Sequence, residues 1–246
     1  MAQSSVYQLL ADSVSLIIDT SSGTPVIAHW GKDVGLDKFQ DELSNLLIES
    51  IPYASIDQPE SPGVWRENSR GFLGRPALAG HRAGQDWSPK FEIKTIENDS
   101  SHLSFVSEDT AAGLEVSVSY QMLPSGVVLV SQSVMNTGDK DYALEQLLTW
   151  LPIPDQATET IDFTGRWVLE RQPQRRKIQS GTWSREVREG RSSHDYTIVQ
   201  LATTEGANYQ QGEIWSTGLM WSGNSRHLVE KLSLIHISEP TRQAEI

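Results

Sequence analysis

The feature that most constrains the fold is the strict alternation of apolar and polar residues from Leu114 to Tyr120. The four apolar side chains of this run lie on one face of an extended strand, because successive side chains of a strand point to opposite faces. One apolar face and one polar face are typical of a strand in an antiparallel sheet. Turn residues at Leu123–Gly126 lead into a second strand-forming run, Val127–Val134, so the sequence predicts a hairpin here.

The same signals recur elsewhere in the chain. Val14–Asp19 and Val26–Trp30 are strand-forming runs on either side of a turn rich in Ser, Gly and Pro, which predicts another hairpin. Further strands are predicted over Leu144–Ile153 and Ile214–Trp221. Helical and strand patterns do not alternate as they do in parallel α/β sheets. We therefore expect an all-β protein built as an antiparallel sandwich.

Two stretches depart from the strand pattern. Apolar residues at helical spacing predict a short helix over Lys38–Glu49. Residues Ile51–Lys90 contain five prolines and five glycines, which is typical of long loops and not of a hydrogen-bonded ladder. Aromatic residues are atypical of disorder, and this stretch holds Tyr53, Trp65, Phe72 and Trp87. We expect an ordered excursion that presents side chains to a ligand or partner.

Composition excludes several classes of function. A chain of this length can form one large core, so a single domain is the expectation. The formal net charge of -12 opposes binding to a phosphate backbone, and no nucleic-acid partner is expected. The absence of cysteine excludes disulfides and thiolate metal sites. No apolar run approaches the roughly 20 residues of a membrane helix, and no signal peptide is recognisable, so we expect a soluble, cytoplasmic protein without a membrane partner.

The segment Gly165–Asn224 combines arginines with carboxylates, aromatic residues and turn glycines. Buried charges in such a segment need partners, so something must order it. Its motifs are Gly165–Arg171, Arg175–Arg176, Glu189–His194 and Gly212–Asn224. In this order they resemble the amino-terminal domain of the glycoside hydrolase family 36 α-galactosidases, which carries Gly-x-Trp-x-x-Glu-Arg, an arginine-rich stretch, Arg-Gly-x-Ser-Ser-His and Gly-Glu-x-x-x-Gly-x-x-x-x-Ser-Gly-Asn. Fainter likeness upstream extends the resemblance over most of residues 5 to 231.

One position departs from the family pattern, since Glu189–Gly190 stands where the family has Arg-Gly. The resemblance implies a galactose-mutarotase-like supersandwich with one or two short helices, and no cofactor. It also implies an enzyme that hydrolyses terminal α-galactosides such as melibiose or raffinose with retention, assembled as a homo-oligomer. In the family the two catalytic aspartates lie on a (β/α)8 barrel, in a Lys-x-Asp-x-Asn and a Gly-rich Arg-x-Asp motif. Neither motif occurs here, so we expect no catalytic residue in this chain, inactivity alone, and substrate binding through the absent barrel.

The end of the chain is interpreted separately. Leu232–Arg242 looks like the translation of a transposase sequencing adapter, and a few arbitrary codons follow to Ile246. We therefore expect residues 1–231 to be an incomplete amino-terminal sandwich domain, and residues 232–246 to be a non-native tail. The alternative is a genuine amphipathic tail.

The carboxylates and histidines give no catalytic pattern of their own. Seven carboxylates are scattered among turns and strand edges, where such residues cap or accept local backbone hydrogen bonds: Asp12, Asp19, Asp57, Asp86, Asp155, Asp162 and Glu213. The histidines show no pairing at the spacing of metal ligands, so no metal site is expected. Ser193 and His194 are adjacent, and adjacent residues of a strand point apart, which is unsuited to a nucleophile and its base.

The arginines of this segment allow two interpretations. They can bind an anionic sugar or phosphate, because the guanidinium group matches such groups bidentately. They can also pair with Glu170, Glu186 and Glu189 and brace the sandwich against the barrel or another subunit, which we favour because a neutral galactoside offers them no charge. Tryptophans here are likewise expected in core or interface more than in sugar stacking. The arginines are Arg166, Arg171, Arg175, Arg176, Arg185 and Arg188, and the tryptophans are Trp167, Trp183, Trp215 and Trp221.

The loop around Arg75 is the predicted substrate contact. In the family an Asp-Phe-Arg motif on the corresponding loop reaches toward the galactose pocket. The sequence Phe72–Ala77 keeps the arginine and the Pro-Ala pair after it but has no aspartate beside it, so the resemblance carries over to Arg75, with Trp65 and Phe72 as neighbours. An arginine that pins the loop through backbone carbonyls is the alternative. For the whole chain, a carbohydrate-binding module and an assembly domain remain alternatives to the enzyme domain.

Overall fold

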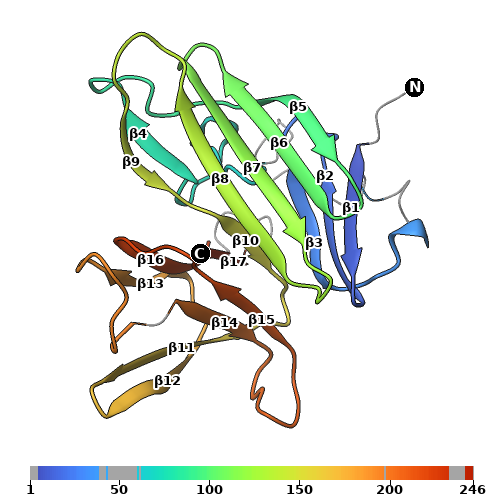
Figure 1. Cartoon of the computed structure of the whole chain (residues 1–246), viewed down its shortest axis with the longest axis vertical. Coiled ribbons are helices and arrows are strands. Elements are labelled where there is room, and N and C mark those ends of the chain that lie inside the picture. Colours follow the sequence, from blue (N-terminus) through green and yellow to red (C-terminus); the bar gives the residue numbers. More distant parts are fainter. Residues whose placement is uncertain are drawn as a thin grey trace, which may run out of the picture. The chain divides into compact units, whose positions relative to one another are not determined.

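Antiparallel β-strands make up most of the chain in the computed structural model (Figure 1). The structure describes residues 5–38, 43, 60, 62–196 and 198–232, together with the backbone of residues 242–245. Two short 3-10 helices occur in this part, η1 (Leu36–Lys38) and η2 (Asn68–Arg70). The predicted all-β antiparallel sandwich with one or two short helices is confirmed. No helix within the described ranges is long and apolar enough to cross a membrane.

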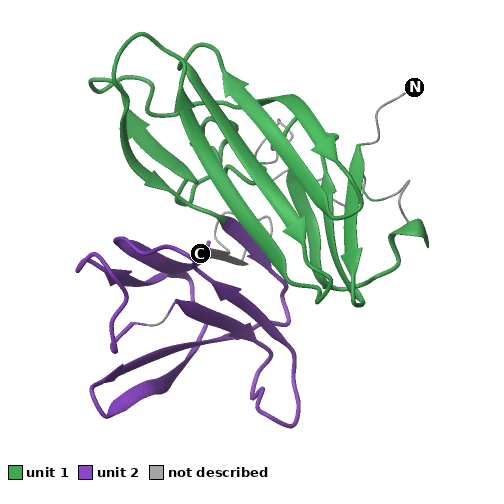
Figure 2. Cartoon of the chain, viewed as in Figure 1, with its two compact units in different colours: residues 1–149 green, residues 150–246 purple. Residues whose placement is uncertain are grey.

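The chain divides into two compact units, residues 1–149 and residues 150–246 (Figure 2). No sequence pattern indicated this division, because the boundary falls inside the apolar run Leu144–Ile153. That run was predicted as one strand. It forms two strands, and they belong to different units.

Unit 1 contains a three-stranded sheet, a four-stranded sheet and a two-stranded ladder, in the orders β1-β2-β3, β5-β6-β7-β8 and β4-β9. All neighbouring strands run antiparallel. The strands are β1 (Val6–Ala11), β2 (Val14–Asp19), β3 (Val26–Lys32), β4 (Leu78–His81), β5 (Glu92–Asn98), β6 (His102–Asp109), β7 (Leu114–Met122), β8 (Val128–Asn136) and β9 (Ala143–Leu147).

The core of unit 1 lies between the two larger sheets. All four apolar residues of the alternating run in β7 are buried, which confirms the predicted half-buried strand. The Tyr7 ring of β1 meets the Phe105 ring of β6 edge to face, with centroids 6.1 Å apart. Such pairs stabilise beyond their buried area, and this one joins the two sheets. The predicted hairpins are confirmed as β2–β3 and β7–β8.

One prediction for unit 1 needs correction, and another lies outside the described part. Leu78–His81 falls in the stretch expected to be loop, yet it forms β4 and pairs with β9. Gly80 fits there because a Cβ at this position would stand only 2.6 Å from the carbonyl oxygen of Ala143. The helix predicted over Lys38–Glu49 falls almost entirely on residues outside the described ranges.

Unit 2 contains two four-stranded sheets, in the orders β12-β11-β14-β15 and β10-β17-β16-β13. Their neighbouring strands also run antiparallel. The strands are β10 (Trp150–Ile153), β11 (Glu159–Arg166), β12 (Leu169–Lys177), β13 (Gly181–Val187), β14 (Val199–Thr203), β15 (Ile214–Gly218), β16 (Ser225–Lys231) and β17 (Arg242–Glu245).

Both sheets of unit 2 contribute to its apolar core. Ile153, Ala202 and Val229 come from β10, β14 and β16 and pack in one cluster. The rings of Trp183 and Trp215 cover this cluster from β13 and β15. Unit 2 is thus a sandwich with its own small core, because apolar faces of two sheets must bury one another.

Candidate functional site

The loop that carries Arg75 leaves the sandwich core at Val64 and returns at Ala77. The Val64 N–H donates to the Pro25 carbonyl at 2.8 Å, and the Ala77 N–H donates to the Trp65 carbonyl at 2.9 Å. The Leu148 N–H in turn donates to the Ala77 carbonyl at 2.7 Å. These three bonds close the loop at its base.

The aromatic residues predicted beside Arg75 are buried. Trp65 is only 1% exposed and its ring packs on Phe91, with centroids 5.9 Å apart. Phe72 is also buried, and the guanidinium of Arg66 lies 5.6 Å from its ring centroid. Both rings therefore support the loop from inside, and Arg66 covers Phe72.

Arg75 itself lies half-buried on the outer part of the loop. Its Nη1 donates to Oε1 of Gln146 at 3.3 Å, and Nε2 of Gln146 donates to the Pro76 carbonyl at 2.9 Å. The neighbouring Leu73 is 71% exposed. The structure thus joins Arg75 to the loop through a glutamine side chain and leaves an apolar residue outermost.

A buried ion pair lies under this loop. Nε of Arg70 donates to Oε2 of Glu67 at 2.8 Å, and Nη2 of Arg70 donates to the Phe91 carbonyl at 2.8 Å. The other oxygen of Glu67 accepts the Phe91 N–H. Burial raises the pKa of Glu67 to about 7, against the opposing effects of these hydrogen bonds and of the Arg70 charge. The sequence analysis did not identify this pair, because the Phe91 backbone that bonds to both side chains lies more than twenty residues later in the chain.

Asn68 connects that ion pair to the loop tip. It begins η2, between Glu67 and Arg70, and its Nδ2 donates to the carbonyls of Phe72 at 2.7 Å and Gly74 at 3.2 Å. Gly71 ends η2 with a φ of 84°, which only glycine adopts without strain. The position of the loop tip therefore depends on the buried Glu67–Arg70 pair.

In unit 2 the centre of the arginine cluster is Asp162, on β11. Its Oδ2 accepts from Nε of Arg185 at 2.5 Å, and its Oδ1 accepts from Nη1 of Arg176. The Trp183 ring lies beside both cations, 4.7 Å from the guanidinium of Arg176 and 5.9 Å from that of Arg185. The cluster involves three strands: β11 and β12 of one sheet and β13 of the other. It therefore links the two sheets of unit 2.

A second buried carboxylate, Glu159, is the first residue of β11 and is held by one arginine. Arg175 donates to its Oε2 at 2.5 Å and to the Ala207 carbonyl at 2.5 Å, while the Gly206 N–H donates to Oε2 at 3.0 Å. These bonds to its charged form lower the pKa of Glu159, led by the Gly206 N–H.

The predicted partners of the arginines are only partly as expected. Glu186 does pair with Arg188, and it also pairs with Arg226. Arg176 instead pairs with Asp162, which the sequence had assigned to local backbone bonding. That assignment is wrong for Asp162, because its partners lie across the sheets and no local pattern shows them.

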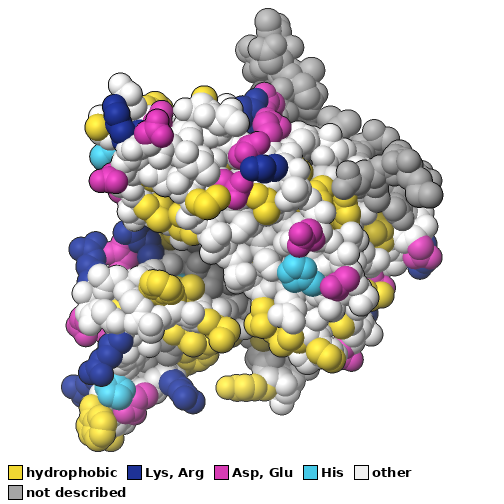
Figure 3. Space-filling view, turned by 45° about the horizontal axis from the view of Figure 1, so that its top comes forward, with side chains coloured by type: hydrophobic (Ala, Val, Ile, Leu, Met, Phe, Trp, Pro, Cys, Tyr) yellow, Lys and Arg dark blue, Asp and Glu magenta, His cyan; other side chains and the backbone are white. Residues whose placement is uncertain are grey.

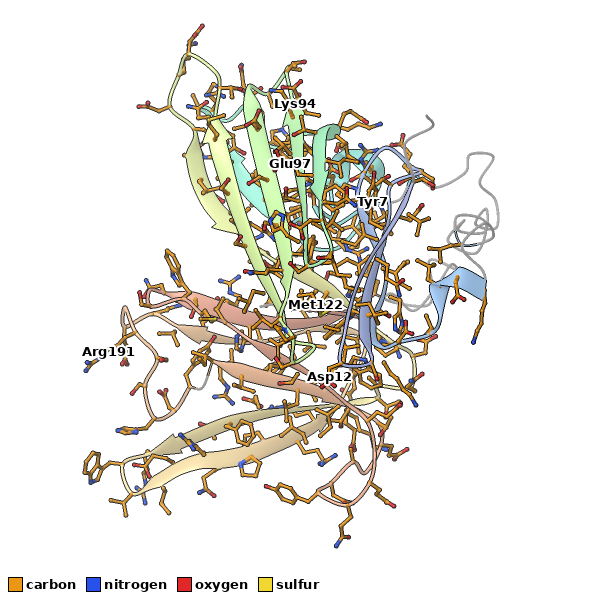
Figure 4. All side chains as sticks on the ribbon, turned by 45° about the vertical axis from the view of Figure 1, so that its right-hand side comes forward. Tyr7, Asp12, Lys94, Glu97, Met122 and Arg191 are labelled. Carbon is orange, nitrogen blue, oxygen red and sulfur yellow. The ribbon has the colours of Figure 1, made fainter. Side chains whose placement is uncertain are left out.

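The separate motifs of the Gly165–Asn224 segment meet at one end of unit 2. The Gly190 N–H donates to Oδ1 of Asn224 at 2.9 Å. The His194 ring meets the Trp167 ring edge to face at 5.7 Å, and its Nδ1 lies 3.8 Å from a carboxylate oxygen of Glu170. Arg191 projects from the loop between β13 and β14, away from both sheets (Figure 4).

Close packing of two strands explains why the first residue of these motifs, Gly165, is a glycine. A Cβ there would contact the Leu169 carbonyl oxygen and would stand 2.8 Å from the Cα of Glu170. Only glycine lets the two strands of the β11–β12 hairpin approach this closely. The tip of that hairpin is exposed and apolar, with Trp167 76% and Val168 74% exposed.

The four tryptophans predicted as core or interface residues separate into two pairs. Trp183 and Trp215 are half-buried against the core of unit 2. Trp167 and Trp221 are exposed, Trp221 by 63%. Figure 3 shows hydrophobic side chains, in yellow, exposed among charged ones on one face of the molecule.

A buried histidine that the sequence did not single out also lies in unit 2. His227 on β16 packs against the Tyr196 ring with centroids 5.4 Å apart. Burial lowers its pKa to about 4, although the charge of Asp162 acts in the opposite direction. No group of three or more His, Cys, Asp or Glu able to hold a metal ion occurs within the described ranges.

The fold and the buried ion pairs define a class of protein: an all-β sandwich domain whose buried carboxylates pair with arginines of the same domain. A family model described as the glycosyl hydrolase family 36 N-terminal domain matches residues 23–237. The chain belongs to this family. This agrees with the resemblance carried by the motifs of Gly165–Asn224.

Known relatives agree with this membership. An α-galactosidase of Escherichia coli is 33% identical over 211 residues, which is 86% of this chain and 29% of that protein. The bifunctional α-galactosidase/sucrose kinase AgaSK of Mediterraneibacter gnavus is 26% identical over 223 residues, 85% of this chain and 22% of that protein. The chain therefore spans less than a third of the length of these relatives.

Solved structures share the fold. The α-galactosidase AgaA of Geobacillus stearothermophilus superposes with a TM-score of 0.82 at 20% identity, over 98% of this chain and 36% of AgaA. The α-galactosidase of Lactobacillus brevis gives a TM-score of 0.83 at 19% identity, over 98% of this chain and 35% of that one.

Proposed function

We propose that this chain is the amino-terminal, non-catalytic β domain of an α-galactosidase that hydrolyses terminal α-galactosides with retention. The observation that carries the proposal is the family match over residues 23–237, combined with coverage of only 29% of the Escherichia coli α-galactosidase. Most of such an enzyme then lies outside this chain, and the reactive carboxyl pair of a retaining glycosidase lies there with it. We keep melibiose and raffinose as the expected substrates and the cytoplasm as the expected compartment.

Within that enzyme we propose that Arg75 contacts the substrate. Its guanidinium can donate several hydrogen bonds in a fixed geometry, and it stands on a loop that is closed at its base and pinned by Asn68. Trp65 and Phe72 take the role of holding this loop, because their rings are buried. A rigidly held donor loses little entropy when it binds a sugar hydroxyl.

The test begins with the gene. Native codons beyond Lys231 should encode a barrel with two catalytic aspartates, and the completed protein should release galactose from melibiose. In that protein Arg75→Ala should lower kcat/KM by about 10- to 100-fold, the value expected for a lost hydrogen bond to a charged donor. Arg75→Lys should recover part of the loss. A reading frame without a barrel, or an Arg75→Ala enzyme of unchanged kcat/KM, contradicts the proposal.

The exposed apolar residues of unit 2 favour a second candidate, an assembly function within a homo-oligomer. They share high exposure and lie on the β11–β12 hairpin tip and around β15: Trp167, Val168, Leu169, Ile214, Met220 and Trp221. Large exposed apolar residues of this kind mark interaction surfaces. Sedimentation of the chain at increasing concentration should show association that Trp167→Ser weakens. A monomer at all concentrations excludes self-association of this chain. Melibiose binding by the isolated chain instead identifies a carbohydrate-binding module.

A further inference from the structure

The sheet β5-β6-β7-β8 of unit 1 ends in two different edges. β5 and β8 each have one sheet neighbour among the described strands, so each has backbone groups along its outer side that lie outside the ladder (Figure 1). Such an edge can pair with a strand of another chain, and proteins normally guard it with charges or bulges. The residues of each edge therefore indicate whether it can accept another strand.

β5 carries both kinds of protection. Its side chains include Glu92, Lys94 and Glu97. Its pairing with β6 also shifts register between Ile93 and Thr95, which is typical of a bulge. A further strand at this edge would meet charged groups and an irregular backbone, so we expect β5 to remain an edge.

β8 has neither protection. It pairs with β7 along its whole length without a register shift. The run Val116–Gly138, which includes all of β8, is the longest run of the sequence without Asp, Glu, Lys or Arg. Leu129 is 37% exposed and Met135 is 50% exposed. Within the described ranges, no segment other than β7 forms a backbone hydrogen bond with β8. An uncharged, regular and partly apolar edge of this kind readily pairs with another strand.

The sequence of β8 is nearly symmetrical about its central residue, Gln132. Residues at equal distances from Gln132 are alike in polarity and similar in size: Ser131 and Ser133, Val130 and Val134, and Leu129 and Met135. When a strand pairs antiparallel with a second copy of itself, residues at equal distances from the two-fold axis become direct cross-strand neighbours. Two copies of β8 paired about Gln132 would therefore bring similar side chains together at each of these positions.

The outer face of β8 shows what such pairing would bring together. Successive side chains alternate between faces, so the exposed face holds four of these residues: Leu129, Ser131, Ser133 and Met135. Ser131 of one copy would lie opposite Ser133 of the other. A serine pair of this kind already exists within the chain, where the Oγ atoms of Ser117 and Ser133 lie 2.7 Å apart. Leu129 of one copy would lie opposite Met135 of the other, so exposed apolar side chains would be covered.

We propose that β8 pairs antiparallel with β8 of a second copy of this chain, in the register that centres on Gln132. The two sheets then join into one continuous sheet whose outer edges are both β5. The contact closes as a dimer, because each copy uses its β8 edge once and the β5 edges are guarded. A second copy fits better than an unrelated strand, because the symmetry of the β8 sequence is matched only by β8 itself.

Charge also favours this edge as the contact between copies. The chain has a formal net charge of -12, so two copies repel one another over most of their surfaces. The uncharged edge is where they can approach with least repulsion. This interface does not depend on the proposed function, since it concerns strand pairing within unit 1 alone. It is also distinct from association through the hairpin tip of unit 2, and Trp167→Ser should leave it unchanged.

Sedimentation equilibrium of the full 246-residue chain measures the interface directly. One strand of each copy makes the contact, so we expect a weak dimer with a Kd of about 1 to 100 μM. Ser131→Lys with Ser133→Lys should raise this Kd about 10-fold or more, because introduced lysines of the two copies then lie opposite one another at two positions. Thr95→Lys with Asn98→Lys is the matched control. It adds the same charge to exposed positions of β5 and should change the Kd by less than about 3-fold.

Charge exchange tests the register. Ser131→Lys with Ser133→Glu places an introduced lysine of one copy opposite an introduced glutamate of the other, so this variant should dimerise within about 3-fold of the parent Kd. Ser131→Glu with Ser133→Glu should dimerise as weakly as the double-lysine variant, yet the two should form a heterodimer when mixed. Because only folded chains can pair in this way, the heterodimer also shows that the substitutions leave the fold intact.

The contrary results are equally specific. A parent chain that stays monomeric up to about 1 mM lacks the interface. A double-lysine variant that dimerises like the parent, or a β5 control that weakens the dimer equally, shows that the copies do not meet at β8. A lysine–glutamate variant as weak as the double-lysine variant, or the absence of a heterodimer on mixing, rejects the register about Gln132.

Discussion

Asp162 offers the sharpest test of how unit 2 is held together. Its side chain is 4% exposed, and it accepts from both Arg176 and Arg185, whose side chains are 31% and 25% exposed. Asp162→Asn keeps the size of the side chain and removes its charge, so two cations are left beside an amide. Breaking a fully buried pair costs about 3 to 5 kcal/mol. Water reaches both arginines in part, so we expect a smaller loss, about 2 to 4 kcal/mol.

The assay is urea and thermal unfolding followed by tryptophan fluorescence, since Trp183 lies against both cations. The expected loss corresponds to a fall in Tm of about 5 to 12 °C. Glu205→Gln is the matched control, because its pair with Lys177 is exposed on both sides, and it should cost less than about 0.5 kcal/mol. If Asp162→Asn is as stable as the parent chain, or if Glu205→Gln costs as much, the cluster does not join the sheets.

The remaining predictions concern pH and backbone packing. Burial raises the pKa of Glu67 from 4.5 to about 7, so its stabilisation is full below pH 4.5 and is lost as the pH rises toward 7. Glu67→Gln should therefore make the free energy of unfolding rise more steeply between pH 4.5 and 6.5, and an unchanged slope in urea titrations contradicts this. Burial lowers the pKa of His227 from 6.5 to about 4, so its stabilisation is full above pH 6.5 and is lost as the pH falls toward 4. His227→Gln should flatten the same profile, and a slope equal to that of the parent chain counts against it. Gly165→Ala should cost about 1 to 3 kcal/mol by forcing the hairpin strands apart, whereas Gly218→Ala, whose nearest contact would be 3.9 Å away, should stay within about 0.5 kcal/mol. Equal unfolding midpoints for these two glycine variants would refute that explanation.

The strands of unit 1 could be predicted because each has one buried face. Leu114–Tyr120 alternates in sequence for the same reason that it alternates in burial, and the turn after it has the residues that a hairpin needs. The run Leu144–Ile153 was predicted as one strand but forms two, because an apolar stretch carries no sequence signal where one compact unit ends and the next begins. β4 was missed because prolines and glycines nearby are typical of loops, while its pairing with β9 is a contact between residues far apart in the chain.

The candidate site could be predicted only in part. The order of the family's motifs identified Arg75 as a candidate and indicated that the segments around His194 belong together. The burial of Trp65 and Phe72 depends on Phe91 and Arg66, and composition does not show which rings will be covered. Asp162 was missed for a similar reason, because its cations lie 14 and 23 residues away on other strands.

The most direct test of the proposed function compares two purified proteins in an assay with an α-galactoside such as melibiose. One is the present chain, and the other is the longer α-galactosidase of which we propose that this chain is the amino-terminal domain. We expect galactose release by the longer protein and none above the buffer blank by the chain alone. Release at an enzymatic rate by the chain alone would contradict it, because the reactive carboxyl pair would then lie within these 246 residues.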